Sequence, residues 1–366
     1  MRHRSSTPAS SSPASCASSA PAPAARPGWP LAAGIIAGVA ADALIGDPHR
    51  GHPVALFGRA AQALEDRLYA DDALRGAGYT IACVALAAAP ALAADRLGRG
   101  RPWLALAATA AATWAVTGAR SLAGEAERIG RALADSDLEA ARAALPSLCG
   151  RDPQQLDDKE ITRAVIESVA ENSGDAIVSP LVWGSAAGIG GLTIYRAVNT
   201  LDAMVGHRSP RLARFGSASA RLDDVANWGP ARLTALLTAA CAPLVGGRPA
   251  RTWRTARTYG PQHPSPNAGW CEAAFAGALG LCLGGSNSYG GVAEQRPELG
   301  DGRVPEPADI ARAVRLCRAV TVAATLVSAA AALAGAALAG AALAGAALAG
   351  AALAGAGSPR RERPTR

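Results

Sequence analysis

Apolar stretches made of small residues recur along this chain, and polar stretches separate them. Half of the residues are apolar but only 4% are aromatic, so Ala, Leu, Val and Gly supply most of the apolar mass. Small side chains let helix backbones approach closely, which suits a membrane bundle better than a large soluble core. We therefore predict an all-α fold, a polytopic membrane helical bundle. The candidate membrane segments are residues 31–46, 76–94, 103–119, 179–195, 231–247, 268–284 and 314–357.

The two ends of the chain differ from its middle. Residues 1–30 are rich in Ser, Ala and Pro, which predicts a disordered extension. Residues 31–330 are predicted to form the membrane-embedded domain. Residues 331–366 form a low-complexity tail, in which Ala-Ala-Leu-Ala-Gly repeats over 331–355. A five-residue step advances about 140° around a helix, so the leucines share no face, and we expect one spanning helix near 314–335.

The net charge of +7 comes almost entirely from arginine, because Lys159 is the only lysine. No nucleic-acid module with interleaved aromatic residues is recognisable, so we predict a lipid bilayer and no nucleic acid as partner. Arginines beside the apolar segments fit the positive-inside bias. The seven cysteines form no C-x-x-C pair and are predicted to be small buried apolar residues.

A first polar cluster, Gly46-Asp-Pro-His-Arg-Gly-His-Pro-Val54, has the Gly and Pro content of a turn. Asp47, His49 and His52 could bind a metal or a phosphate there. A solvated turn is the alternative.

The second cluster spans residues 161–175. Arg163, Glu167 and Glu171 recur at four-residue intervals, which places them on one helical face. Two carboxylates one turn apart repel each other unless a cation joins them, and a divalent metal holding ATP phosphates would do so. The alternative is a solvated face with an Arg163–Glu167 ion pair.

The third cluster spans residues 195–206. Arg196, Asn199 and Asp202 follow a three-residue spacing and share a helical face. Arg196 could hold phosphate and Asp202 a metal, and a buried Arg–Asp pair is the alternative.

The fourth cluster spans residues 215–232. Asp223 and Asn227 lie one turn apart, and Arg221 and Asp224 lie three residues apart. Adjacent acids followed by Asn fit oxygen ligation of magnesium, with a helix cap or an ion-pair network as the alternative. Pro230 is predicted to begin a new helix.

The fifth cluster begins at Pro264. Asn267 is predicted to cap the following helix, with Glu272 in its first turns, and a substrate contact is the functional alternative. The chain has no Walker P-loop, Rossmann glycine fingerprint or G-x-S-x-G motif. Any nucleotide chemistry would therefore use arginines and a carboxylate-bound metal.

These clusters, in this order, resemble the cobinamide-phosphate synthase family of membrane proteins. The resemblance covers roughly residues 34–320, and its long, specific part is 150–232. The chain departs from the family at its Ser/Pro-rich start, at its repeated tail, at Lys159, and at Cys271, where proline is expected. The matching strings are GDPHRGHPV, GRDPQQLDDKEITRAVIESVAENSGDAIVSPLVWG, YRAVNTLDAMVGH, FGSASARLDDVANWGPARL and SPNAGWCEAAFAGALGLCLGG.

The resemblance implies a carbon–nitrogen ligase of cobalamin (vitamin B12) biosynthesis, with ATP and Mg²⁺ as cofactors. The acid is the free propionate of adenosylcobyric acid, a corrinoid. The amine is (R)-1-aminopropan-2-ol or its O-phosphate, and the product is adenosylcobinamide or its phosphate. The expected location is the cell membrane, with several spans and an active site that faces the cytoplasm. A homo-oligomer and a complex with other corrinoid enzymes both stay open.

The site residues fall into three expected groups. Catalytic residues are expected at Glu167, Glu171, Asp175, Asp223 and Asp224. Metal ligands are expected at Glu167, Glu171, Asp223 and Asp224. Substrate-binding residues are expected at Asp47, His52, Asn172, Arg196, Asn199, Asp202, Arg221, Asn227, Arg232 and Asn267.

Residues 179–195 decide whether these groups meet. If this segment crossed the bilayer, the second and third clusters would face opposite sides of the membrane, so we expect that it does not cross. A membrane transporter and a non-catalytic scaffold for corrinoid enzymes are the rival functions. A transporter would suit Gly-interrupted helices, but the polar residues concentrate outside the apolar stretches.

Overall fold

The computed structural model describes residues 28–48, 50–206, 209–289 and 292–356. Most of the expected disordered extension and His49 lie outside the described residues. The chain divides into two units, one of residues 27–335 and one of residues 1–26 with 336–366. The site described below lies in the first unit.

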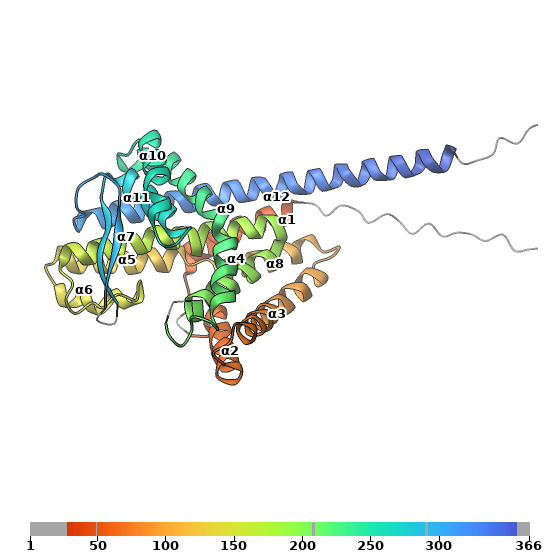
Figure 1. Ribbon diagram of the computed structural model, residues 1–366. Helices are drawn as coiled ribbons and strands as arrows, with labels where there is room; N and C mark the ends of the chain where they lie inside the picture. Colours follow the sequence, from red (N-terminus) through yellow and green to blue (C-terminus); the bar gives the residue numbers. More distant parts are fainter. Residues whose placement is uncertain (1–27, 49, 207–208, 290–291, 357–366) are drawn as a thin grey trace, which may run out of the picture. The chain divides into compact units, whose positions relative to one another are not determined.

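The described chain is predominantly helical, which confirms the predicted fold class (Figure 1). Short 3₁₀ or π-helical turns join several of the helices. The α-helices are α1 Trp29–Ile45, α2 Pro53–Leu68, α3 Ala73–Leu97, α4 Pro102–Val116, α5 Ala119–Ala134, α6 Leu138–Ala144, α7 Asp158–Asn172, α8 Ser179–Leu201, α9 Ser217–Cys241, α10 Pro249–Tyr259, α11 Ala268–Leu279 and α12 Ala308–Ala356.

Small residues join α1 to α4, as the composition predicts. A Cβ added at Gly34 would lie 2.6 Å from the Cβ of Thr109, and one at Gly38 would lie 2.4 Å from the Cβ of Thr113. Glycines four residues apart therefore let the two backbones approach more closely than any side chain would allow.

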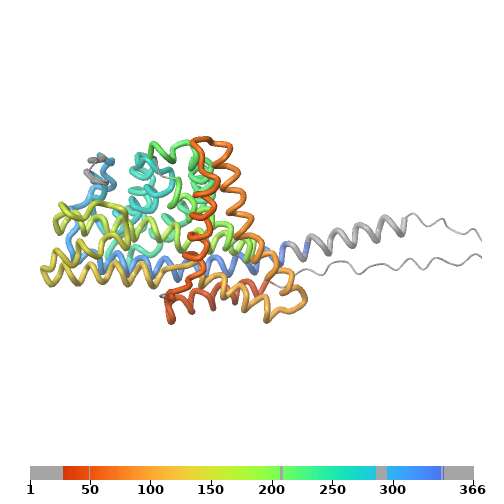
Figure 2. Tube along the Cα trace, turned by 90° about the horizontal axis from the view of Figure 1, so that it is seen from below, coloured from red at the N-terminus to blue at the C-terminus, as the bar shows by residue number. Residues whose placement is uncertain are grey.

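The two largest of four clusters of buried apolar residues in the described chain pack the helices together. The larger one surrounds α7, where Val165 and Ile166 pack with Ile129 of α5 and Phe275 of α11. The smaller one includes Tyr79 of α3 and packs that helix against the chain after α8. Both views of the chain show α2 and α3 as neighbours (Figures 1 and 2).

Three described helical segments are long and apolar enough to cross a membrane. They are Ala73–Leu97, Asp158–Gly206 and Ala308–Leu338. The expected spanning helix near 314–335 lies within the third. The second contains α7 and α8 together with two π-helical turns, η2 Ser173–Val178 and η3 Asp202–Gly206.

A β-hairpin follows α11, where the sequence indicated only apolar and Gly-rich residues. Strands β1 Leu283–Tyr289 and β2 Val292–Leu299 pair antiparallel. Gly284 and Gly285 both have positive φ, and they produce a bulge at the start of β1. These glycines mark the start of β1, and no strand was predicted there from the sequence.

Candidate active site

The helix α8 folds back on itself. It is broken at Ala187 and Gly188, where Gly188 has a φ of +64° that glycine adopts without strain. After the break, the chain returns along its own first half. A Cβ added at Gly191 would lie 1.9 Å from the carbonyl oxygen of Trp183.

One amide side chain joins the two ends of this fold. The Oδ1 atom of Asn227 accepts hydrogen bonds from the Ser179 hydroxyl at 2.6 Å and from the Tyr195 hydroxyl at 2.8 Å. A straight helix would separate residues 179 and 195 by about 24 Å. The segment is therefore not a single straight helix. That it does not cross the bilayer stays a prediction.

A proline in helix α9 creates a contact between α9 and the folded-back helix α8. Pro230 lies inside α9, so the prediction that it begins a new helix is wrong. Proline has no N–H, which leaves the carbonyl of Ala226 without its usual helical donor. The indole Nε1 of Trp183 donates to that carbonyl at 3.0 Å. The missing helical bond is thus replaced by a bond from α8.

Asp223 is buried on α9, beside the two ends of α8. Its Oδ2 accepts from the Asn227 side chain at 2.9 Å, and its Oδ1 accepts from the Asn199 side chain at 3.4 Å. Burial, and then the negative charge of Asp202, raise the pKa of Asp223 to about 7. This carboxyl can therefore hold or release a proton near neutral pH.

Asp175 lies in the π-helical turn η2 and is half-buried. It interacts electrostatically with three other carboxylates, those of Asp223, Glu171 and Asp202. The positive charge of Arg196 also acts on it. We refer to Asp175, Asp202 and Asp223 as the aspartate end of the site.

The polar turn of residues 46–54 lies near the aspartate end. Arg196 interacts electrostatically with Asp47 as well as with Asp175, and its Nη1 donates to Asn199 at 3.4 Å. The Nε2 atom of His52 lies 3.4 Å from Oδ1 of Asp47. The structure thus brings Asp47 and His52 to the aspartate end, beside Arg196.

Glu167 is buried and has its partners within the protein. Arg151 donates to its Oε2, and the backbone N–H of Gly284 donates to its Oε1 at 2.6 Å. Arg163 lies 4.0 Å from the same carboxylate, as an i, i+4 pair. The ion pair with Arg163 is present, but the interpretation of Glu167 as part of a solvated face is wrong.

Glu171 is exposed, although the preceding residues of α7 are nearly all buried. It interacts electrostatically with Arg296 of β2, with Glu167 and Arg151, and with Asp202. Glu171 therefore connects the aspartate end to a second set of charges. We refer to Arg151, Arg163 and Arg296 as the arginine end.

Glu272 of α11 completes the arginine end. Its side chain is buried, and it interacts electrostatically with Glu167, Glu171 and Arg296. The Nε2 atom of His263 lies 3.9 Å from its Oε1. The sequence placed Glu272 in a helix start, and tertiary packing turns it toward the other acids.

Arg232 does not point into this group. Its guanidinium stacks on the rings of Trp228 and Trp270 at 4.7 and 4.9 Å, and its Nη1 donates to Oδ1 of Asn267 at 2.9 Å. Its guanidinium is thus engaged by two indole rings and an amide, and substrate binding by Arg232 stays a prediction.

Four other predicted site residues also have partners elsewhere or face solvent. Asn267 does not cap α11 with its side chain, because Ser265 Oγ accepts from the first backbone N–H groups and the Asn267 amide donates to the carbonyl of Asp224. Arg221 and Asp224 have exposed side chains on α9. Asn172 donates to Ser168 within α7.

In the described part of the chain, no three His, Cys, Asp or Glu side chains are grouped closely enough to hold a metal ion by themselves. Both oxygens of Glu167 are already occupied, whereas Glu171 and Asp175 stay accessible. Mg²⁺ commonly takes only one or two carboxylates and completes its shell with water and substrate phosphates. The predicted ligand set of Glu167, Glu171, Asp223 and Asp224 stays a prediction, and Glu171 with Asp175 is the pair of accessible carboxylates that fits magnesium best.

Several residues of the site were missed by the sequence analysis. Tyr195 and Ser179 carry the fold-back, and Arg151 and Arg296 carry much of the positive charge. Arg296 lies far along the chain from α7 and in a strand, so helical spacing gives no signal for it. Arg151 stands in the quoted string GRDPQQ, but no spacing pattern in the sequence marked it as a site residue.

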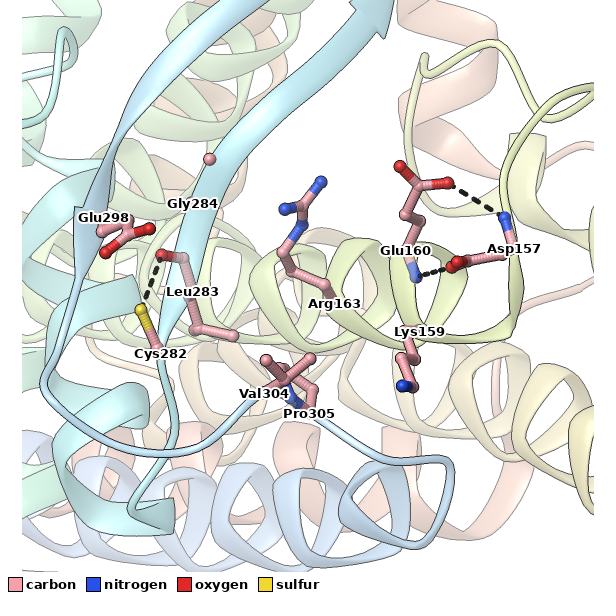
Figure 3. A pocket seen from close by; sticks show the side chains of 11 residues that line it. Asp157, Lys159, Glu160, Arg163, Cys282, Leu283, Gly284, Glu298, Val304 and Pro305 are labelled. Carbon is pink, nitrogen blue, oxygen red and sulfur yellow. Dashed lines mark hydrogen bonds between the residues drawn. The ribbon is translucent and has the colours of Figure 1, made fainter.

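Two cavities flank the site. One, of about 180 Å³, lies between the start of α7 and the hairpin, and Figure 3 shows Arg163 reaching into it toward the strand of Gly284. The other, of about 320 Å³, is almost wholly apolar and is lined by α2, α3, α4 and α8, with Arg196 among its walls. The charged centre therefore has a polar neighbour on one side and an apolar one on the other.

Comparison with known proteins assigns these features to a family. The sequence model described as CobD/Cbib protein matches residues 35–317. A cobalamin biosynthesis protein CobD of Mycobacterium tuberculosis is 52% identical over 299 residues, which cover 81% of this chain and 94% of that protein.

More distant relatives carry the same name. CobD of Chromobacterium violaceum is 45% identical over 281 residues, covering 75% of this chain and 88% of that protein. CobD of Geobacter metallireducens is 39% identical over 303 residues, covering 80% and 95%. No solved structure matches the chain.

Proposed function

Because this chain belongs to the CobD/Cbib protein family, we propose that it acts in cobalamin biosynthesis as an ATP-dependent carbon–nitrogen ligase. It joins (R)-1-aminopropan-2-ol, or its O-phosphate, to the free propionate of adenosylcobyric acid. The observation that supports this proposal is the fold-back of α8, which brings Asp175, Arg196 and Asp223 into electrostatic interaction with one another and with Glu171.

The reaction needs an activated acid. A carboxylate is a poor electrophile, because an attacking amine would have to expel oxide. In the proposed first step, a carboxylate oxygen forms a bond to the γ-phosphorus of ATP while the bond to ADP breaks, and ADP leaves with the electron pair. In the second step, the amine forms the C–N bond and phosphate leaves. Positive side chains offset the charge that develops in both steps.

The two ends of the site suit the two substrates. The aspartate end has three carboxylates and a single nearby arginine, Arg196, so it favours a cation such as the substrate ammonium. The arginine end favours phosphate oxygens. Asp223, with a pKa of about 7, is the candidate base that takes the proton from the ammonium.

Bound magnesium would supply charge neutralisation for the ATP phosphates at Glu171 and Asp175. These two carboxylates lie one turn apart on the chain and interact electrostatically. Their mutual repulsion is relieved when a divalent ion joins them.

The location follows from the substrates. ATP and corrinoid intermediates are cytoplasmic, so the proposed site faces the cytoplasm at the membrane boundary. Three apolar helical segments support association with the cell membrane, and several spans are part of the proposal.

The direct test is product formation by the full chain in detergent. Cobyric acid, ATP and aminopropanol phosphate are incubated with the purified protein, and the amide is followed by mass spectrometry. Ligation is expected to fall by about 10²–10⁴-fold in Asp223→Asn, as for loss of a general base, and strongly in Glu171→Gln. Glu139→Gln, at an exposed carboxylate that pairs only locally with Arg142, is the matched control.

Absence of product with the wild-type chain would favour a transporter or a scaffold instead. Full ligation by both Glu171→Gln and Asp223→Asn would remove the proposed site while leaving the family membership intact.

A further inference from the structure

Two glycines of the β-hairpin, Gly284 and Gly285, pack against charged residues of the site. The N–H of Gly284 donates to Glu167 at 2.6 Å, and a Cβ added at Gly285 would lie 2.9 Å from Nη1 of Arg163. The hairpin backbone therefore lies directly against the arginine end. A side chain at Gly285 would displace the guanidinium beneath it.

The same glycines determine where the second strand runs. A Cβ added at Gly284 would lie 2.1 Å from the carbonyl oxygen of Pro297, and the φ of Gly284 is +83°. Only glycine permits both the close approach and the backbone conformation. Gly285 is paired in register with Arg296, so this approach carries Arg296 over α7.

Arg296 interacts electrostatically with two carboxylates of the site. Glu167 is already bonded by Arg151, whereas Glu171 and Glu272 both interact electrostatically with Arg296. Of these, Glu171 is the accessible one. Placing the Arg296 guanidinium beside these acids removes water from charged groups, which costs free energy. Clusters of charges that interact in this way occur often at functional sites.

We propose that Arg296 is a catalytic residue that binds the phosphoryl group as it passes from ATP to the carboxylate substrate. This inference rests on the proposed function. As the bond to ADP breaks and the bond to the carboxylate oxygen forms, the guanidinium fork donates to the phosphoryl oxygens and keeps its interaction with Glu272. Arginine suits this task because its planar donors match phosphate oxygens in pairs.

The test isolates the first step. Full-length protein in detergent is given ATP, labelled ADP and cobyric acid without the amine, and the cobyric-acid-dependent ADP–ATP exchange is measured. Arg296→Ala should lose about 10²–10³-fold in exchange, as for loss of a donor to a developing charge. Arg296→Lys, which keeps the charge but not the paired donors, should lose at least tenfold. Gln295→Ala, at the neighbouring exposed residue of β2, should exchange like the wild type.

The outcomes separate the two proposals. If the wild-type protein shows no exchange and also forms no amide when the amine is added, the ligase proposal fails. If it forms the amide but shows no exchange, the separate phosphoryl transfer assigned to Arg296 is overturned. If the wild type exchanges and Arg296→Lys exchanges equally well, only the role of Arg296 is overturned. Thermal unfolding of each variant is measured in parallel, and Arg296→Lys decides the question if Arg296→Ala does not fold.

Discussion

At the scale of single residues, the Asn227 side chain forms hydrogen bonds with three other side chains of the site. One oxygen accepts from Ser179 and Tyr195, and its nitrogen donates to Asp223. All four side chains are buried. Removing the amide leaves buried polar groups without partners, which costs more than the bonds themselves contribute.

We therefore expect Asn227→Ala to lower the free energy of unfolding by about 1–3 kcal/mol. Thermal or denaturant unfolding in detergent measures the change. Asn199→Ala is the comparison, because Asn199 is half-buried and its bond to Asp223 is longer, at 3.4 Å. Equal stability of the two variants would show that Asn227 does not hold the fold-back.

Asp223 gives the protein a specific dependence on pH. Its pKa rises from an ordinary value of 3.8 to about 7 in the folded chain, chiefly because it is buried. Between these pH values the folded state binds more protons than the unfolded state, so stability falls as pH rises. The contribution is fully present below about pH 4 and is lost as pH rises through about 7.

The expected result is a decline in unfolding temperature between pH 5 and 8 that is smaller in Asp223→Asn. Ligation should follow the opposite direction, because the proposed base must be ionised. An unchanged pH profile of stability in Asp223→Asn would contradict the assignment of the raised pKa to this residue.

At the scale of the elements, the fold-back of α8 depends on close approach of its two halves. Gly191→Ala would place a Cβ 1.9 Å from the Trp183 carbonyl, so the halves must separate. We expect a loss of about 1–3 kcal/mol in unfolding free energy, together with reduced ligation. Gly190→Ala is a matched control, because a Cβ there meets nothing within 4 Å. It should be as stable as the wild type or slightly more stable.

Local sequence patterns predicted the helical class and the helix α7, whereas features that depend on tertiary contacts could not be predicted from the sequence. Small-residue composition predicted the helical class, and the four-residue spacing of α7 predicted which acids share a face. Pro230 reads as a helix start in sequence, but Trp183, forty-seven residues earlier, replaces the bond that proline removes. The same limit hid Arg296, whose electrostatic interaction with Glu171 depends on its pairing with a strand that begins at a hairpin bulge.

The structure brings more of the predicted acids together than of the predicted cations. Glu171, Asp175, Asp202 and Asp223 interact with one another as the clustering of polar motifs suggests. Among the predicted arginines, Arg196 lies with them, whereas Arg232 is held between indole rings. Arginine is long and stacks on aromatic rings as readily as it binds anions, so its sequence position alone does not reveal its partner.

At the scale of the whole molecule, the fold-back of α8 predicts that the residues before and after it lie on the same side of the membrane. The chain enters this region at α7 and leaves through α9, and both ends of α8 meet at Asn227. A segment that returns to its starting side adds no net crossing. The polar residues before it and after it must then face the same compartment, and this is what a site shared between α7 and α9 requires.

This arrangement predicts the accessibility of residues on the two sides of α8. Lys159 at the start of α7 and Arg221 on α9 are both exposed, so Lys159→Cys and Arg221→Cys should react with a membrane-impermeant maleimide in inverted vesicles and not in intact cells. The wild-type chain is labelled in parallel as the background, because Cys149 and Cys282 are only half-buried, whereas Cys83, Cys241, Cys271 and Cys317 are buried. Labelling of the two positions from opposite sides would mean that 179–201 crosses the bilayer. The acids of α7 and α9 could not then serve one reaction.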